Sequence, residues 1–283
     1  MANGIDGIDH AVVAVADLAQ AKARFERLGF TTTPRRRMVG WGTANYSVMF
    51  DDKDFIELLG VVDPTAFLTP GLADFLAEGE GAMAVTLRAN DVAAAHDALS
   101  RQGADPTPLN EVTINCEAPD GVVPQSFRWL KIGEAATPDM YLMLVQPLTP
   151  QNMRRPAWVT HANGARRIRS MTIAVKEPTA LRAHYERLFG AAARPIAGGF
   201  EIFTGHGDFR FLTAASLAEE YVGYAAAISH PPPAIAILTL ETDDLAAAKA
   251  CLVSAGATHE SLNNMIRVAP EDACGVILEF VAG

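Results

Sequence analysis

Cysteine is scarce in this chain of 283 residues, and its three cysteines, Cys116, Cys251 and Cys274, are odd in number and far apart. Neither a disulfide framework nor a Cys-x-x-Cys metal site is therefore expected. No apolar run approaches the roughly 18 residues that span a bilayer, and the first residues have neither the basic start nor the apolar core of a signal peptide. We expect a cytoplasmic protein with no membrane partner.

Positive charge is also in short supply. The chain has 23 Lys and Arg against 33 Asp and Glu, which gives a formal net charge of −10. This balance argues against nucleic acid as a partner, because phosphate binding needs a basic face. The catalytic patterns GxSxG, GxxxxGK[ST] and HExxH are missing as well. Hydrophobic content of 49% nevertheless indicates an ordinary globular protein, and the length suggests about two domains.

A helix frame recurs four times along the chain. Each copy spans 12 residues from its start to a closing glycine (29−17, 103−91, 190−178 and 256−244). Aspartate suits the N-cap, proline suits the first helical position, and glycine suits the left-handed residue after the last turn. An apolar strand precedes each helix and strand-like segments follow it. The four predicted helices are Asp17–Gly29, Asp91–Gly103, Pro178–Gly190 and Asp244–Gly256.

These repeats predict an α+β fold of four βαβββ units arranged as two paired modules. The final strand of each unit is expected in an apolar run: Phe55–Leu59, Met140–Val145, Phe209–Leu212 and Val276–Val281. We assign residues 1–150 to the first module pair, which carries the site. Residues 165–283 form a second pair that we interpret as structural. A monomer or a symmetric homodimer is expected, because two units already complete one curved sheet.

His10 and Glu57 are ligand-type side chains inside two otherwise apolar strands of the first unit. A polar group on a buried strand face costs a few kcal/mol unless something pairs with it. This pair is the best functional clue in the sequence.

The pattern of βαβββ units in pairs, with His10 on a first strand and Glu57 on a last strand, resembles the vicinal oxygen chelate superfamily. The segments Gly42-Thr43-Ala44-Asn45-Tyr46 and His161-Ala162-Asn163-Gly164-Ala165 more narrowly resemble bacterial glyoxalase-like domain proteins. The resemblance covers nearly the whole chain. It implies a cup-shaped sheet that holds a divalent metal, and it leaves the reaction open, since the superfamily includes isomerases, lyases, dioxygenases and metal-free binding proteins.

In the register of the helix frame, His10 aligns with Ala84, Met171 and Ile237. The apolar patterns of the last strands align Glu57 with Gln146, Phe211 and Glu279. Only the first unit keeps both ligand types, so the metal ligands are expected to be His10, Glu57 and, as a weaker oxygen donor, Gln146. His161 is a further possible donor. The alternative is a buried His10–Glu57 hydrogen-bonded pair without metal.

The resemblance favours a metal-dependent glyoxalase-like enzyme of the lyase or isomerase type, with Glu57 catalytic and a small oxygenated molecule as substrate. Zn, Mn, Ni, Fe or Mg would each suit such a site. The alternatives are a metal-free binding protein of the bleomycin-resistance type and an extradiol-dioxygenase-like enzyme. The dioxygenase is less favoured, because non-haem iron oxygenases use two histidines and Ala84 takes the place of the second.

Four residues are candidates for substrate binding. Asn45 lies in the segment that carries the resemblance, although an ordinary turn amide would look the same. Trp41 and Trp129 lie on strands expected to line the cup, where core packing and an apolar pocket use the same residues. Arg37 belongs to a basic cluster that either steers a carboxylate-bearing substrate or forms a solvated strand end.

Overall fold

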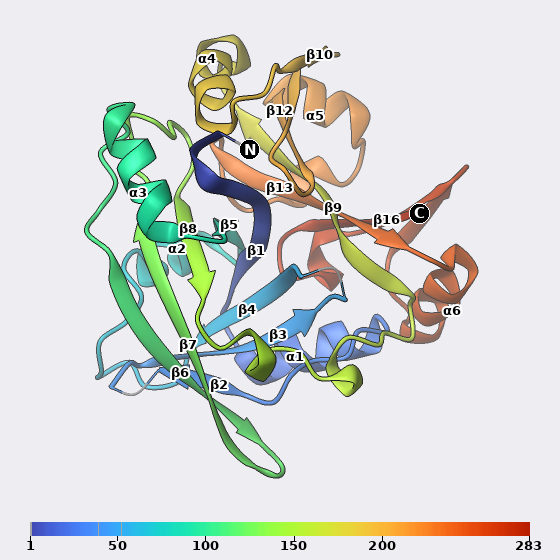
Figure 1. The fold of residues 1–283 in the computed structure, drawn as a ribbon. Helices are drawn as coiled ribbons and strands as arrows, with labels where there is room; N and C mark the ends of the chain where they lie inside the picture. Colours follow the sequence, from blue (N-terminus) through green and yellow to red (C-terminus); the bar gives the residue numbers. More distant parts are fainter. Residues whose placement is uncertain (1, 39, 52) are drawn as a thin grey trace.

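The computed structural model describes residues 2–38, 40–51 and 53–283, whose strands form one strongly curved sheet of 16 strands (Figure 1). The four predicted βαβββ units are present. The first two units are β1 (Ile5–Val15), α1 (Leu18–Arg27), β2 (Arg36–Met38), β3 (Thr43–Met49) and β4 (Phe55–Val61), then β5 (Gly81–Ala89), α3 (Val92–Arg101), β6 (Asn110–Ala118), β7 (Gly121–Lys131) and β8 (Leu142–Pro147).

The third and fourth units repeat this order in the C-terminal half. They are β9 (Ala165–Val175), α4 (Pro178–Phe189), β10 (Arg194–Ile196), β11 (Gly199–Phe203) and β12 (Asp208–Thr213), then β13 (Ala234–Thr242), α6 (Leu245–Ala255), β14 (His259–Leu262), β15 (Met265–Val268) and β16 (Ile277–Ala282). A short helix, α2 (Leu72–Glu78) or α5 (Ala214–Glu220), follows the first unit of each half. No helix in the described ranges is long and apolar enough to cross a membrane.

Capping fixes where the four helices begin. The side chain of Asp17 accepts hydrogen bonds from the backbone N–H groups of Ala19 and Gln20, and Asp91 and Asp244 cap their helices in the same way. In α4 the N-cap is Glu177 and Pro178 is the first helical residue. The third copy of the frame therefore starts one residue earlier than its proline suggests, which changes the register of that unit.

The N-terminal half closes its strands into a ring. The order is β1-β4-β3-β2-β6-β7-β8-β5, and β5 pairs back with β1 in the antiparallel sense. Because successive side chains point to opposite faces, the ring has a convex face and a concave interior. The convex face packs against α1 and α3 through a core that includes Phe25 and Leu99.

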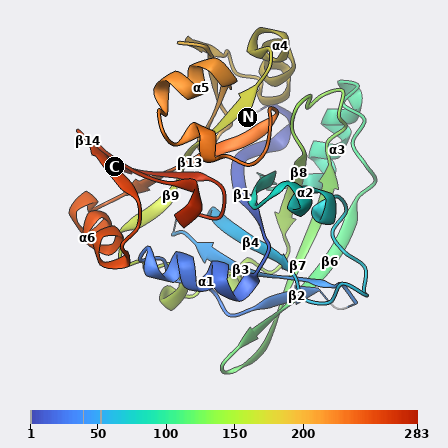
Figure 2. The same ribbon diagram turned by 180° about the vertical axis from the view of Figure 1, so that it is seen from behind.

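The C-terminal half forms an open sheet with the order β10-β11-β12-β9-β13-β16-β15-β14. It joins the ring where β13 meets β5, at the register pair Ile235 and Ala82. Figure 2 shows the same arrangement from behind, with α1 and α6 close together. The two halves therefore share one continuous sheet.

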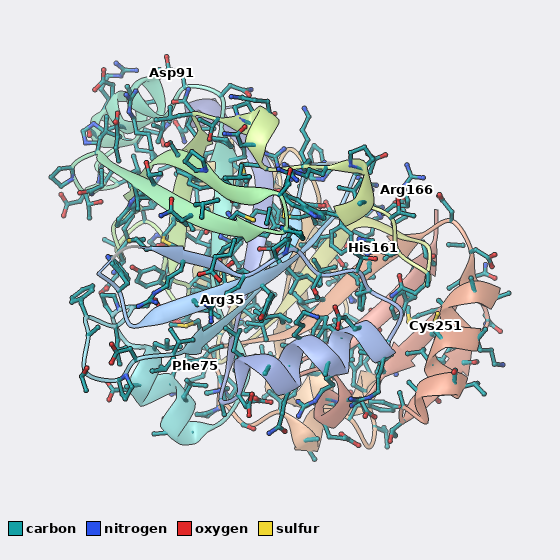
Figure 3. All side chains as sticks on the ribbon, turned by 90° about the horizontal axis from the view of Figure 1, so that it is seen from below. Arg35, Phe75, Asp91, His161, Arg166 and Cys251 are labelled. Carbon is teal, nitrogen blue, oxygen red and sulfur yellow. The ribbon has the colours of Figure 1, made fainter. Side chains whose placement is uncertain are left out.

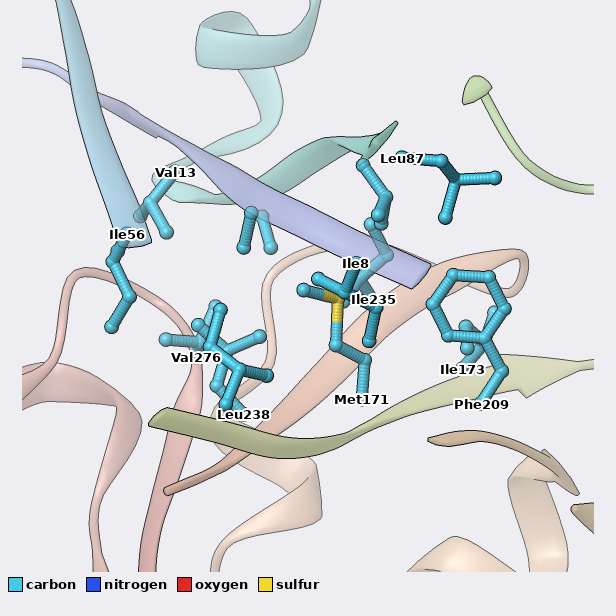
Figure 4. Close-up of a cluster of buried hydrophobic side chains, with 14 of the residues drawn as sticks. Ile8, Val13, Ile56, Leu87, Met171, Ile173, Phe209, Ile235, Leu238 and Val276 are labelled. Atoms are coloured by element: carbon cyan, nitrogen blue, oxygen red, sulfur yellow. The ribbon is translucent and has the colours of Figure 1, made fainter. Parts of the chain in front are cut away.

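The halves also share one apolar core. Ile8, Val13 and Leu87 of the ring pack with Met171, Ile173 and Phe209 of the C-terminal half in one buried cluster (Figure 4).

At its edge, β1 approaches the turn before β12 very closely, since the Ile8 N–H donates to the His206 carbonyl at 3.0 Å. Gly7 has φ +101°, and a Cβ there would lie 2.2 Å from the His206 nitrogen, so only glycine fits.

His161 belongs to the connection between the halves and lies between the N-terminal strands and the C-terminal half (Figure 3). Its Nδ1 accepts a hydrogen bond from the Thr31 N–H at 3.0 Å, and its Nε2 donates to the Met49 carbonyl at 3.0 Å. Burial lowers the pKa of His161 to about 4, with the bond to Met49 acting in the opposite direction. Both ring nitrogens are used, so His161 is a neutral structural residue and is not free to bind a metal.

This burial predicts an acid-sensitive fold. The unfolded chain binds a proton at His161 below about pH 6.5 while the folded chain resists it until about pH 4, so stability is complete above pH 6.5 and falls as the pH drops. We expect His161 to account for a loss of about 2 kcal/mol between about pH 8 and pH 5. Urea unfolding at the two pH values measures it. His161→Gln should make the free energy of unfolding depend less on pH in this range. An unchanged dependence on pH would contradict the assignment to His161.

Candidate functional site

The candidate site lies on the concave face of the N-terminal ring, where β1 and β4 run in parallel. Val12 is the register partner of Glu57, and His10 lies two residues earlier on the same face. The His10 Nε2 is 3.4 Å from the Glu57 Oε2, and the two side chains are 12% and 16% exposed. The prediction that these side chains meet inside the cup is confirmed.

Asp9 orients His10. Its Oδ1 lies 2.7 Å from the His10 Nδ1, and its Oδ2 accepts from the Arg88 Nε at 3.1 Å. Burial alone would raise the pKa of Asp9, but the hydrogen bond to His10 and the charges of His10, Arg88 and Arg154 outweigh it and hold the pKa below its usual range. An ionised Asp9 accepts the Nδ1–H, so that Nε2 is the ring nitrogen facing Glu57.

Asn45 orients Glu57 in a similar way. Its Nδ2 donates to the Glu57 Oε1 at 3.0 Å, so the amide oxygen of Asn45 points elsewhere. That oxygen is buried and has no hydrogen-bond partner among the described residues. The His10 ring also stacks on Phe55, with the ring centroids 4.2 Å apart. Both functional side chains are thus held by neighbours on adjacent strands.

The donor set of this pair fits a divalent ion. When the only ring proton of His10 is on Nδ1 and Glu57 is a carboxylate, two acceptor atoms face each other, and a proton or a cation between them removes the repulsion. Two donor atoms about 2.1 Å from one ion, at the tetrahedral angle, are roughly 3.4 Å apart, as Nε2 and Oε2 are. A carboxylate on the second ring nitrogen, as Asp9 provides, is the usual companion of a metal-binding histidine.

The number of donors is small. In the described part of the chain, no three His, Cys, Asp or Glu side chains form a group able to hold a metal. Catalytic zinc sites usually have three protein ligands. A metal on His10 and Glu57 would therefore leave its other positions to water or substrate oxygens.

The alignment that offered Gln146 as the counterpart of Glu57 is wrong. Thr86 lies five residues before the N-cap Asp91, as Val12 does before Asp17 (91−86 and 17−12), so Thr86 is the counterpart of Val12. The register partner of Val12 is Glu57 and that of Thr86 is Met143, which makes Met143 the counterpart of Glu57. The Gln146 side chain instead accepts a hydrogen bond from the Val92 N–H at the start of α3, at 3.2 Å. A uniformly apolar run does not fix its own register, which explains the error of three residues.

The third unit needs a similar correction. Counting from the N-cap Glu177 puts Ser170 in the place of His10, rather than Met171. The counterpart of Glu57 is then Arg210, the partner of Thr172, rather than Phe211. The fourth unit keeps the expected pair, Ile237 and Glu279. The conclusion that only the first unit keeps both ligand types still holds.

On the C-terminal concave face, Glu279 is already paired with side chains of its own half. Glu279 accepts hydrogen bonds from Thr239 at 2.8 Å and from Arg267 at 3.3 Å. The Arg267 guanidinium lies 4.0 Å from the ring centroid of Tyr221, which follows α5 and packs into the same face. These contacts occupy both carboxylate oxygens of Glu279.

Arg36, rather than the predicted Arg37, points into the cup. The two neighbours on β2 point to opposite faces, so Arg37 is exposed while Arg36 is buried. The Arg36 Nη1 donates to Ser47 at 2.8 Å on the concave face. Burial lowers the pKa of Arg36, and the nearby charge of Glu57 opposes that shift. Arg37 as a pocket residue is therefore wrong.

The two tryptophans predicted to line the cup, Trp41 and Trp129, lie in different places. Trp129 packs against the concave apolar cluster that contains Phe55 and Phe127, so it lines the cup. Trp41 meets Phe67 edge to face, with the ring centroids 4.7 Å apart, in the segment between β4 and α2.

Several residues on the concave face were not predicted from the sequence. Asp9, Thr86 and Gln125 are buried polar side chains at the cup, and Thr86 is the register partner of His10. Asp9 precedes His10 directly, so its role could have been suspected from adjacency. Thr86 and Gln125 read as ordinary strand residues and carry no comparable signal.

A test of the Asp9 contacts follows from their geometry. In wild type we expect nitrogen-15 NMR to show His10 with its proton on Nδ1 at neutral pH, and Asp9→Asn should shift it toward Nε2–H. Unfolding should become easier by about 3 kcal/mol, because Arg88 stays buried without its carboxylate. The exposed pair of Glu117 and Arg35 is the control, and Glu117→Gln should cost at most about 1 kcal/mol. An unchanged tautomer in Asp9→Asn would contradict the assignment.

Comparison with known proteins agrees with this fold. Residues 8–189 match the family described as glyoxalase-like domain. A hypothetical protein from Staphylococcus aureus superposes with a TM-score of 0.67 at 11% identity, covering 98% of this chain and 99% of that one. No curated protein matches the sequence.

Two further solved structures share the fold. A mutant of 4-hydroxymandelate synthase from Streptomyces coelicolor has a TM-score of 0.62 at 12% identity, covering 98% of this chain and 92% of its own. A xylose isomerase-like TIM barrel/4-hydroxyphenylpyruvate dioxygenase fusion protein has a TM-score of 0.60 at 16% identity, covering all of this chain and 49% of its own. With more than half of its length matched by the family and with this fold, the chain belongs to the glyoxalase-like domain family of the vicinal oxygen chelate superfamily.

Proposed function

We propose that this protein is a metal-dependent enzyme of the glyoxalase-like, lyase or isomerase type that acts on a small oxygenated organic molecule. The observation that carries the proposal is the facing pair of acceptors, His10 Nε2 and Glu57 Oε2, 3.4 Å apart in a partly exposed cup. Asp9 and Asn45 hold these two groups from behind, as a preorganised site requires.

His10 and Glu57 would hold the divalent ion. When bound, the ion supplies polarisation of a substrate carbonyl or stabilisation of an enolate. The chain's own contribution is positional: Asn45 fixes the Glu57 Oε1, so that Oε2 faces His10, where one lone pair would hold the ion and the other can accept or return a substrate proton. The apolar cluster around Phe55 and Phe127 limits the water that reaches these atoms.

Lyase or isomerase chemistry is favoured over oxygenation by the residues opposite the pair. Non-haem iron oxygenases use two histidines and a carboxylate with open positions. The second-unit counterparts of His10 and Glu57 are Ala84 and Met143, neither of which supplies a second histidine.

Metal binding tests the proposal directly. We expect elemental analysis of protein purified without added metal to show a bound divalent ion, and titration of Mn²⁺ or Zn²⁺ into stripped protein to show one site. His10→Ala and Glu57→Gln should each weaken binding at least about 100-fold, since each removes one of two ligands. Isothermal titration calorimetry measures both.

Glu279→Gln is the matched control, because Glu279 holds the same register position in the fourth unit. It should lower stability, since Arg267 loses a buried carboxylate, yet leave metal affinity unchanged. If this change abolished binding while His10→Ala did not, the active half would be misassigned. A metal-free protein that still binds apolar ligands would favour a sequestering role for the cup.

A further inference from the structure

Arg36 is a buried cation with an unused hydrogen-bonding edge. Arg36 is 2% exposed, and its Nη1 donates a hydrogen bond to the Ser47 hydroxyl. Its Nε is buried, and neither Nε nor Nη2 makes a hydrogen bond to any of the described residues. No ion pair joins Arg36 to a carboxylate in the described part of the chain. The free Nε–Nη2 edge is the one that binds a carboxylate through two parallel bonds.

The surroundings hold this guanidinium without neutralising it locally. It lies 5.6 Å from the ring centroid of Phe55 and 5.9 Å from that of Phe127. The two other arginines near the cup are occupied: Arg88 binds Asp9, and Arg154 donates to the Phe50 carbonyl. A buried charge without a direct partner is unfavourable, and folded proteins keep such groups chiefly where something binds them.

Unpaired polar atoms gather on the same concave face. Six buried side-chain atoms in the described residues have no partner, and four of them belong to concave positions of the ring: Arg36 Nε, Asn45 Oδ1, Thr86 Oγ1 and Gln125 Oε1. Asn45 is the register partner of Arg36 on the neighbouring strand, so the donor and an acceptor lie side by side. Orphaned polar atoms concentrated in one interior indicate a polar ligand there.

We propose that the cup binds a small organic acid with a hydroxyl on the carbon next to its carboxylate. The Nε–Nη2 edge of Arg36 holds the carboxylate, and the Asn45 Oδ1 accepts the hydroxyl proton. Since the other amide atom of Asn45 holds Glu57, this arrangement places the hydroxyl-bearing carbon beside Glu57. The assignment names the substrate class of the site proposed above and rests on that proposal.

Three probes separate the two contacts: mandelate, mandelamide and phenylacetate. Mandelamide lacks the negative charge, and phenylacetate lacks the hydroxyl. Titration calorimetry in EDTA, with stripped protein, should show mandelate binding about tenfold or more tighter than each of the others, because a site built for a polar group rejects analogues that lack it. Working without metal separates this test from metal binding, so either proposal can fail alone.

Variants assign the contacts to residues. Arg36→Met should reduce the preference for mandelate over mandelamide to within about twofold, and Arg36→Lys, which lacks the fork, should lose most of it. Asn45→Ala should remove the preference for mandelate over phenylacetate and keep the preference for mandelate over mandelamide. Arg37→Met, on the opposite face of the same strand, is the matched control and should bind like wild type. Equal affinity for mandelate and mandelamide in wild type, or full preference in Arg36→Lys, would overturn the proposal.

Discussion

The antiparallel pairing of β1 with β5 is the constraint on which the rest of the molecule depends. It closes eight strands into a ring, and closure gives the sheet an interior that no helix of the usual convex layer can reach. The same pairing brings His10 opposite Thr86 and leaves β4 on the other side of β1. A polar cup is possible because β1 is hydrogen-bonded along both edges and cannot shift to expose a different face.

The two halves use one scaffold in different ways. In the C-terminal half Glu279 is neutralised by Arg267, and Tyr221 covers that pair from the segment after α5. In the N-terminal half the equivalent helix, α2, packs on Leu59 and Ala84, and the side chains of His10 and Glu57 keep 12% and 16% of their surface exposed. The direct ion pair of Arg267 with Glu279, which Arg36 does not form with Glu57 in the described part of the chain, therefore distinguishes the C-terminal copy from the N-terminal one. The register equivalence of Glu57 and Glu279 makes the comparison direct.

The fold could be predicted from the sequence because its signals are local. An aspartate cap and a closing glycine act within one helix, and their repetition revealed four units before any long-range contact was known. Register was harder. Apolar runs such as the one ending at Val145 pack equally well in several alignments, and a proline at N1 hid the true N-cap Glu177. Only strand pairing, which is a property of the folded sheet, decided against Gln146 and Phe211.

Side-chain direction explains the remaining difference between Arg37 and Arg36. One residue of displacement along β2 moves a guanidinium from the solvent to the cup, and nothing in a run of three arginines says which member points inward. Inside the cup Arg36 and Glu57 balance each other's charge at a distance without forming an ion pair. Each thus keeps a free edge, which a fully paired salt bridge such as that of Glu279 has given up. Two incompletely paired charges in one interior lower the stability of the fold, and a ligand that bonds to both of them would offset this loss.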